Sequence, residues 1–563
     1  MRHFRTKTRT TRATARGAAH RPAFTLVEML VAIGIVVLMM SLFAEIFQLA
    51  ADSMTKQRGI AENDQRSRSF ILIIKGDLDK RTFRYMMPFA ANENTIADGR
   101  AIPTVKRQGY FSISENDPNN NTDDILQFTV RSTVRLKNAD DTPYYGHATL
   151  YLNLPWGDAN GDGTINGIDL FSHPNQPEAD DGQIAFDATS NSSAAEVSYF
   201  LRNGNLYRRV LLIREPLPLA GENSQPTLSN GFDLFDRDPD NNPATPTPGA
   251  VYSGDFWTDY DFSAFYHVTP PGPSIHGAHF HGIASLANEV PGGGLFPLAK
   301  PFNRFGHSHA TGNPREYFGA NGGGAFLGRF THEETSHPAF NYPHDLATAP
   351  AANTNPMNRA TALADTTPAN GVPDAYELGP RMGEDLLLGH VQSFDVKIWD
   401  DGYIETDSNG NGQADPAEDY NGNGVLDFAG AFVDVGHAYP VGRYRNSQKV
   451  TTLSGGGAYL YGPSTTAANN RIYDTWHPQV DLDGDGIPDP PPFRPAADNG
   501  KDGQPGRARI DDNADSTTDD AGETGWWGSD DLHPLQAIQI TVRFLDVSSN
   551  QIRQVTFVHS LVD

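Results

Sequence analysis

A long apolar run lies near the N-terminus of the chain. No charged residue occurs between Met29 and Ala44, and a single carboxylate, Glu28, stands just before this run. A helix of about 20 apolar residues spans the hydrocarbon core of a bilayer, so the run predicts a transmembrane helix. Residues 1–23 contain basic side chains and no acid. Because basic residues favour the cytoplasmic side, the rest of the chain is expected beyond the membrane.

The helical pattern continues past the apolar run. Residues 45–87 contain no proline, and Pro88 is expected to end the helix. Five apolar residues share one face at helical spacing: Phe70, Ile71, Ile74, Leu78 and Tyr85. This stripe predicts that the second half of the helix packs on a sheet.

Strand patterns follow as separate islands. The predicted single strands and the closing pair are residues 125–130, 147–154, 386–399, 537–545 and 552–561. Residues 197–213 predict a β-hairpin, because Asn203-Gly204 is a favoured two-residue turn. A helix followed by hairpins indicates an α+β fold with an antiparallel sheet.

Composition indicates how much of the chain lies outside these elements. The 563 residues include 54 glycines and 40 prolines, so long loops are expected. The formal net charge of −26 argues against binding to nucleic acid and favours either divalent cations or simple solvation of the surface. The chain has no cysteine, so disulfides are not available to an exported protein, and calcium is the alternative means of fixing loops.

The start of the apolar run carries a specific motif. The segment Ala23-Phe24-Thr25-Leu26-Val27-Glu28 resembles the processing site of type IV prepilins and type II secretion pseudopilins. The resemblance implies that prepilin peptidase cleaves between Ala23 and Phe24, that the new N-terminus is methylated, and that Glu28 pairs with the N-terminal amine of a neighbouring subunit. Ala23 stands where the family usually has glycine. A plain signal-anchor is the alternative, although a lone acid in lipid is costly without a partner.

The strand islands resemble the body of a J-type minor pseudopilin. Residues 196–210 are similar to its hairpin, residues 388–399 to its middle strand and residues 534–561 to its closing hairpin. The resemblance implies a pilin-like α+β fold, in which a long N-terminal transmembrane helix packs on an antiparallel sheet that carries large loop-rich inserts.

The expected organisation alternates sheet segments with inserts. In order, it comprises a basic prepilin leader (1–23), the transmembrane and pilin helix (24–87), the first part of the sheet domain (88–213) with an insert at 155–195, a Gly/Pro/aromatic insert (214–384), a sheet strand (385–400), an Asp/Asn-rich insert (401–531) and the C-terminal hairpin (532–563).

Asp/Asn-rich segments in the inserts have the spacing of calcium loops, with oxygen ligands at alternate positions and glycine at the sixth. Residues 158–169 and 407–418 are full twelve-residue matches, whereas the copy that starts at Asp419 has Gly430 at position 12. The candidate ligands are Asp158, Asn160, Asp162, Thr164, Asn166, Asp169, Asp407, Asn409, Asn411, Gln413, Asp415, Glu418, Asp419, Asn421, Asn423, Asp427, Asp481, Asp483, Asp485 and Asp489.

The first of these segments resembles half of a dockerin, and the later copies resemble thrombospondin type 3 calcium repeats. Residues 511–520 form a looser acidic cluster. The resemblance and the spacing favour structural calcium, whose binding energy serves as folding energy. The alternative is that these residues make solvated turns.

Histidines form a second group of candidate ligands. His276, His279 and His281 could bind zinc or copper, with His307, His309, His332, Glu333, His337 and His344 nearby in the sequence. No HExxH motif, nucleophile elbow, P-loop or dinucleotide fingerprint accompanies them. We therefore expect scattered loop histidines and no enzymatic activity.

Three functions remain open at this stage. The first is a minor pilin or pseudopilin in the inner membrane, with its C-terminal domain in the periplasm or in a cell-envelope filament, and with other pilins and prepilin peptidase as partners. The second is a membrane-anchored, calcium-dependent binding module exported by the prepilin route. The third is a metal-dependent hydrolase that uses the histidines.

Overall fold

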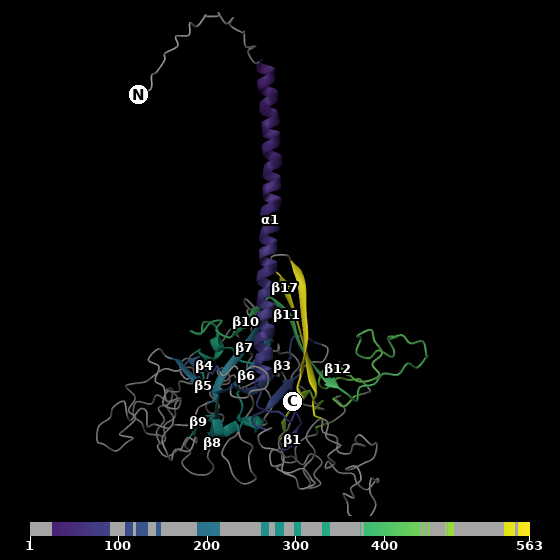
Figure 1. The fold of residues 1–563 in the computed structure, drawn as a ribbon. Coiled ribbons are helices and arrows are strands. Elements are labelled where there is room, and N and C mark those ends of the chain that lie inside the picture. The colour runs from purple at the N-terminus through teal and green to yellow at the C-terminus, as the bar shows by residue number, and fades with distance from the viewer. Residues whose placement is uncertain are drawn as a thin grey trace, which may run out of the picture. The chain divides into compact units, whose positions relative to one another are not determined.

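The structure is a computed structural model, and Figure 1 shows its α+β arrangement of one long helix and antiparallel sheets. It divides into two compact units, Met1–Asn63 and Asp64–Asp563. The described residues are 25–90, 107–115, 120–132, 142–147, 189–213, 261–268, 276–286, 298–305, 329–337, 372, 376–439, 442–444, 449–450, 468–469, 471–477, 534–546 and 550–562.

Helix α1 spans Leu26–Asp79, a total of 54 residues. Its first part, Leu26–Ala51, has a mean hydropathy of 2.6 and is the helix long and apolar enough to cross a membrane within the described part of the chain. Its side chains are exposed, as at Leu26 (79% exposed). This stretch has the length and composition of a single membrane span or a signal anchor.

The helix ends at Asp79, so the predicted end at residue 87 is wrong. The chain turns to strand-like pairing directly afterwards, because the N–H of Thr82 donates to the carbonyl of Thr129 at 2.9 Å. Tyr85 therefore lies outside the helix. The remaining prediction for the apolar stripe holds, since Phe70, Ile74 and Leu78 are at most 2% exposed and belong to the main core.

The larger sheet has six antiparallel strands in the order β10-β7-β6-β3-β2-β15. Its strands are β2 Phe111–Ser114, β3 Ile125–Arg131, β6 Ala194–Arg202, β7 Asn205–Ile213, β10 Leu386–Gly389 and β15 Ile472–Asp474. The predicted hairpin is confirmed as β6 and β7. Its turn residues Asn203 and Gly204 have φ values of 48° and 79°, as a type I′ turn requires.

Both faces of the six-stranded sheet are covered. Neighbouring residues of a strand point to opposite faces, and Arg208 and Arg209 of β7 illustrate this. The guanidinium of Arg208 donates to Asp77 of α1, with Nε at 2.8 Å. Arg209 instead donates to the carbonyl of Phe330 at 2.7 Å and to the hydroxyl of Thr335 at 2.9 Å. The end of α1 thus lies on one face, and described segments of the insert 214–384 lie on the other.

The second sheet has four antiparallel strands in the order β12-β11-β17-β18. They span Ala431–Val433 (β12), Val391–Asp400 (β11), Ala537–Asp546 (β17) and Gln551–Ser560 (β18). The closing hairpin predicted at the C-terminus is confirmed as β17 and β18 (Figure 1). Phe557 of β18 packs edge-on against Phe70 of α1, with ring centroids 6.3 Å apart.

The strand predicted at 386–399 is two strands in two sheets. His390 has a left-handed φ of 58°, which breaks the extended run between β10 and β11. The chain therefore passes from the six-stranded to the four-stranded sheet at this residue. Periodicity alone cannot reveal the break, because apolar residues continue on both sides of it.

The remaining described elements are short. They are β1 Phe89–Ala90 paired in parallel with β16 Trp476–His477, β4 Tyr144–His147 with β5 Thr189–Ser192, β8 Ala264–Val268 with β9 His276–Phe280, β13 Lys449–Val450 with β14 Ala468–Asn469, the 3-10 helices η3 Ile283–Leu286 and η4 Pro301–Asn303, and the helix α5 His332–Thr335. The strand predicted at 147–154 overlaps β4 at one residue, His147. Residues 148–154 lie outside the described part of the chain.

Candidate functional site

The first tandem loop, residues 407–418, folds around its own carboxylates. Asp407 accepts hydrogen bonds from three backbone N–H groups of the loop, at 2.7, 3.1 and 2.8 Å. The amides of Asn409 and Asn411 both donate to Oδ2 of Asp415, at 2.7 and 2.8 Å. A half-turn of either amide exchanges its nitrogen for its oxygen at nearly the same place. The loop therefore offers converging oxygen ligands of the kind that hard cations take.

Glu418, at position 12 of the first loop, is 5% exposed. Its Oε1 accepts a hydrogen bond from the N–H of Ser408 at 2.8 Å. Its Oε2 is buried and has no hydrogen-bond partner among the described residues. A buried carboxylate oxygen left unsatisfied is costly, and position 12 is where calcium loops supply a bidentate acid. The donor set of the first loop thus fits calcium.

The second tandem loop, residues 419–430, repeats this arrangement. Asp419 accepts from two backbone N–H groups of the loop at 3.1 and 2.8 Å. The amides of Asn421 and Asn423 both donate to Oδ2 of Asp427, at 2.8 and 2.9 Å. The ligands at positions 1, 3, 5 and 9 therefore converge as they do in the first loop.

The two loops differ at position 12. Gly430 occupies this position in the second loop with a φ of 94°. A Cβ there would lie 2.8 Å from the carbonyl oxygen of Asp400 and 2.8 Å from the ring of Trp399, closer than real contacts allow. The tight backbone approach excludes a side chain, so the second loop has no carboxylate of its own at this position.

Glu405 lies just before the first loop and holds the backbone of the second loop, and the sequence pattern did not predict this role. This residue is 1% exposed, and its carboxylate accepts from the N–H groups of Tyr420 at 2.8 Å and Asp427 at 3.1 Å. The hydroxyl of Tyr403 donates to it at 2.7 Å. The one sequence signal for this role is that Glu405 lies two residues before the first loop. That position does not indicate that the side chain is buried.

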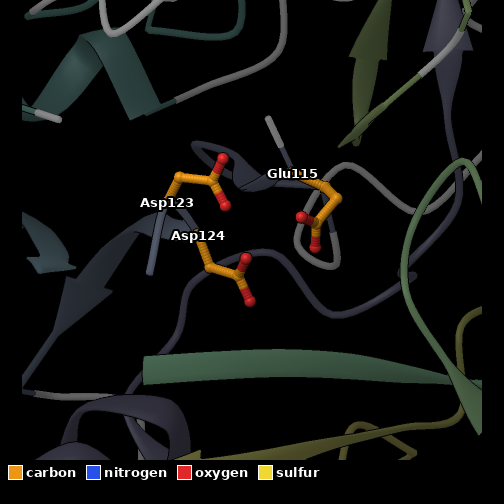
Figure 2. Close-up of side chains that lie close together, drawn as sticks. All are labelled: Glu115, Asp123 and Asp124. Atoms are coloured by element: carbon orange, nitrogen blue, oxygen red, sulfur yellow. The ribbon is translucent and has the colours of Figure 1, made fainter. Parts of the chain in front are cut away.

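A buried acidic cluster, also not predicted, lies at one end of the six-stranded sheet. Glu115 follows β2, and Asp123 and Asp124 precede β3 (Figure 2). Ser114 pairs with Ile125, which brings the next residue of each strand to the same edge. One carboxylate oxygen of each acid lies within 4.8 Å of the others, and all three residues are at most 2% exposed.

Burial and mutual repulsion change how these acids titrate. Burial raises the pKa of Glu115 well above its usual value, and the charge of Asp124 adds to the rise. The pKa of Asp124 is raised by burial and by the charge of Asp395. Lys397 lies near, but its ammonium bonds both oxygens of Asp434, at 2.7 and 2.9 Å. The cluster therefore favours bound protons, and its geometry would also suit a metal ion.

Two of the candidate histidines, His281 and His332, have contacts within the fold, and His276 and His279 belong to β9. A nitrogen of His281 forms a hydrogen bond with the carbonyl of Asn303 at 2.7 Å. Nδ1 of His332 lies 3.6 Å from Asp261, and burial lowers the pKa of His332 despite this carboxylate. Within the described residues, the acidic cluster is the one group of three or more His, Cys, Asp or Glu side chains whose ligand atoms lie within 4.8 Å of one another, and it contains no histidine. His307, His309 and His344 lie outside the described part.

Other predicted site residues also fall outside the described part of the chain: Ala23, Phe24, the loop at 158–169, the copy at 481–489 and the cluster at 511–520. Glu28 is described. Its Oε2 accepts from the N–H of Thr25 at 2.9 Å, and its own N–H donates to the Thr25 hydroxyl at 3.2 Å. The pair forms a capping box at the start of α1.

Comparisons of the chain with protein-family models, with curated proteins and with solved structures found no match.

Proposed function

We propose that this chain is a minor pilin or pseudopilin subunit of a type II secretion or type IV pilus-like filament. The observation that carries the proposal is α1. This helix begins directly after Phe24-Thr25, contains Glu28 in an otherwise apolar first part, and continues unbroken to Asp79. Its last turns pack on antiparallel sheets through Phe70, Ile74 and Leu78, the arrangement expected of a pilin-like fold.

Processing and location follow from the same segment. Prepilin peptidase removes residues 1–23, and the amine of Phe24 becomes the methylated N-terminus. The protein sits in the inner membrane by a single pass, with the basic N-terminus cytoplasmic and the C-terminal domain in the periplasm or in a cell-envelope filament. Mass spectrometry of the protein isolated from membranes tests this, since the mature chain should begin with a methylated Phe24.

Glu28 is the assembly residue in this proposal. In the single chain its carboxylate caps α1 through Thr25. In a filament, the amine of a neighbouring subunit would compensate the acid in lipid, where an unpaired charge is costly. Assembly and capping require different groups. Pairing with an amine requires the negative charge of Glu28, whereas the cap requires the side chains of both Thr25 and Glu28.

Two variants separate these roles. Glu28→Gln keeps an acceptor for the cap but removes the charge, and we expect it to be lost from filament fractions while its soluble part stays folded. Thr25→Ala removes the cap but keeps the charge, and we expect it to be incorporated. Equal loss of both variants from filaments would assign Glu28 to helix capping and contradict the assembly role.

A position at the filament tip, or a low copy number, suits the bulk of the inserts. The chain devotes residues 214–384 and 401–531 to inserts. The described part of the first packs on a face of the six-stranded sheet, and the second supplies the strands β12 and β15 to the two sheets. Repetition of such bulk in every subunit of a thin fibre would crowd neighbouring subunits. Quantitative mass spectrometry of purified filaments should therefore find few copies relative to the main subunit.

Calcium in the tandem loops fixes the second insert. Glu418 supports this, because its buried Oε2 is without a hydrogen-bond partner in the described structure and suits a cation. We expect chelation to loosen residues 405–430 in hydrogen exchange while the two sheets keep their protection. Loss of protection in the sheets to the same extent would contradict a sheet core that is stable by itself.

The alternative function is a membrane-anchored, calcium-dependent binding module that uses the prepilin route for export alone. A cavity beside the second tandem loop favours it. If Glu28→Gln leaves every measurable function intact and no filament subunit co-purifies with the chain, this alternative replaces the filament role.

A further inference from the structure

A cavity of about 340 Å³ is lined by one face of the four-stranded sheet and by the second tandem loop. On the sheet, Lys397 and Trp399 of β11 point to the same side, because alternate residues of a strand do so. Lys397 is paired with Gln539 of β17. Trp399 is paired with Phe432 of β12. The loop contributes Asn421, Asn423 and Asp427. The volume is at the small end of the range for sites that bind small molecules, so the cavity suits a small ligand rather than a folded partner.

Three aromatic rings line the cavity, and each lies against a neighbouring ring. The ring centroids of Trp399 and Phe432 are 5.1 Å apart, with planes at 66°. The ring of Tyr439 lies 4.8 Å from that of His437. All three lining rings are partly exposed. An aromatic ring attracts a cation that lies over its face within about 6 Å of the centroid, and it offers apolar contact area to an alkyl chain. The rings therefore suit a ligand with a positive charge and an apolar part.

Negative charge exceeds positive charge at the cavity. Among the described lining residues, the carboxylates are Asp427 and Asp434, and the cation is Lys397. The Lys397 ammonium bonds both oxygens of Asp434, at 2.7 and 2.9 Å, and lies 3.8 Å from a third acid, Asp395. Burial and then the charge of Asp434 raise the pKa of the Tyr439 hydroxyl, as a negative potential does. The cavity should therefore attract cations and repel anions.

The two lining carboxylates retain lone pairs for a ligand. An ionised carboxylate has about four acceptor positions. From described residues, Asp434 accepts two hydrogen bonds, both from Lys397. Asp427 accepts two at one oxygen, Oδ2, from the amides of Asn421 and Asn423 at 2.8 and 2.9 Å. An ammonium group carries a positive charge and donates hydrogen bonds, so it can use the remaining positions without displacing these bonds.

We propose that this cavity binds an organic ammonium ion. The ammonium group of a primary amine donates to the carboxylates of Asp427 and Asp434. The alkyl chain of the amine packs on Trp399 and Phe432. No metal ion takes part in this recognition, because the carboxylates and the rings supply both the charge and the contact area. The amine is a free molecule or the lysine side chain of another protein, since both present the same group. The inference goes beyond the filament role and does not depend on it.

The test uses the full chain in detergent, at neutral pH and a fixed calcium concentration. Isothermal titration compares n-butylamine with two ligands of the same length, the neutral n-butanol and the anionic butyrate. We expect saturable binding of the amine, about tenfold tighter than that of the alcohol, because the rings and carboxylates attract its charge. Butyrate should not bind. If the amine does not bind saturably, or if the alcohol or butyrate binds as tightly, the proposal is overturned.

A blocked pentapeptide of glycine with a central lysine identifies the source of the amine. Binding of this peptide at least as tight as that of n-butylamine assigns the lysine side chain of another protein. Tighter binding of n-butylamine assigns a free amine. The control peptide has norleucine in place of lysine and therefore lacks the ammonium group. Equal binding of the two peptides would contradict recognition of the charge.

Variants assign the binding to the cavity. Trp399→Ala should weaken binding of the amine about tenfold, and Trp399→Phe should restore part of the affinity. Phe428→Ala is the matched control, because Phe428 is an aromatic residue of the second tandem loop that is 61% exposed and is not among the described lining residues. This control should bind the amine as the wild type does. Equal weakening by Phe428→Ala and Trp399→Ala would overturn the location.

Lys397→Gln provides a test that does not rely on a loss of binding. The substitution removes the cation that competes with the ligand for Asp434 and keeps a polar side chain. We expect about tenfold tighter binding of the amine, because the repulsion between two like charges is removed. Loss of structure cannot produce a gain in affinity, so this result would separate recognition from unfolding. Unchanged or weaker binding in a variant with the circular dichroism spectrum of the wild type overturns the proposal.

Discussion

The described part of the insert 214–384 and the tandem loops of the insert 401–531 are held by different kinds of charged contact. The described part of the insert 214–384 is fixed by buried ion pairs, such as Arg202 of β6 with Glu334 of α5, whose side chains are 2% and 0% exposed. The described loops of the insert 401–531 bond mostly to themselves, as Asp407 does with the backbone of its own loop.

Because of this difference, the stability of the two regions should depend differently on cations in solution. A buried pair carries its own counter-charge, so its contribution needs no ion from solution. Removing one partner is strongly destabilising, because the other charge stays buried. The tandem loops gather carboxylates without cationic side chains among them and gain their full stability only when a cation binds. The described part of the insert 214–384 should therefore resist chelation, and the tandem loops should respond to it.

The largest expected effect tests the buried pair. Arg202→Met leaves Glu334 buried without its partner, and breaking such a pair costs about 3–5 kcal/mol in unfolding free energy. Urea unfolding followed by circular dichroism measures this loss. Arg443→Met is the matched control, because its pair with Asp401 is about one-third exposed and such pairs contribute at most about 1 kcal/mol. Similar losses in the two variants would remove the distinction between buried and exposed pairs.

The next effect tests the closed tandem loop. Glu418→Gln removes one charged ligand from a loop whose calcium affinity depends on ligand charge. We expect calcium affinity to fall about a hundredfold, which corresponds to ~2.7 kcal/mol, with little change in unfolding when chelator is present. Calorimetric titration measures the affinity. Glu384→Gln, a 48% exposed carboxylate outside the loops, is the control and should leave calcium binding unchanged.

A smaller effect separates the two loops at their glycines. Gly430→Ala places a Cβ against Asp400 and Trp399 at a φ of 94°, and such strain costs about 1–3 kcal/mol. Gly410→Ala also has a positive φ, 69°, but nothing lies within 4 Å of its Cβ. Thermal unfolding should therefore show the larger loss for Gly430→Ala. If Gly410→Ala costs as much, the close approach at Gly430 has no consequence.

A further effect is the pH dependence of the ion-pair region. Burial raises the pKa of Asp385 to about 6 from 3.8, although Arg209 opposes the rise. The folded state therefore binds the proton more tightly than the unfolded state does. The contribution of Asp385 to stability is complete below about pH 3.8 and is lost as pH rises to about 6. Thermal unfolding in this window should lose the corresponding slope in Asp385→Asn.

Asp261 supplies the control for this prediction, because its shift has the opposite sign. Burial opposes its ionisation, but His332 and Arg381 outweigh burial and lower the pKa of Asp261 to about 2. Its contribution to stability is present above about pH 3.8 and disappears as pH falls to about 2. Asp261→Asn should therefore alter the pH profile below pH 4 and keep the slope between pH 4 and 6. A slope that disappears there would contradict the assignment to Asp385.

Much of the fold could be predicted because its signals are local. Residues close in sequence predict three of its elements: the apolar run of α1, the β6–β7 hairpin with its Asn203-Gly204 turn, and the closing hairpin. The same is true of the spacing in the tandem loops, where twelve consecutive residues bring their own oxygens together. The end of the helix and the division at His390 could not be predicted, since pairing with Thr129 and a change of sheet decide them.

The candidate sites show the same division. Local sequence patterns were enough to predict the apolar helix with Glu28, the hairpins and the ligand spacing of the tandem loops, because period and spacing act over a few residues. The pairing of strands and the packing of loops brought Glu115 to Asp123 and Asp124 in a buried cluster, buried Glu418, and set Gly430 against Asp400 and Trp399. Burial and close approach arise when segments far apart in the sequence pack together, as with Arg202 of β6 and Glu334 of α5, which are 132 positions apart, and no local pattern records them.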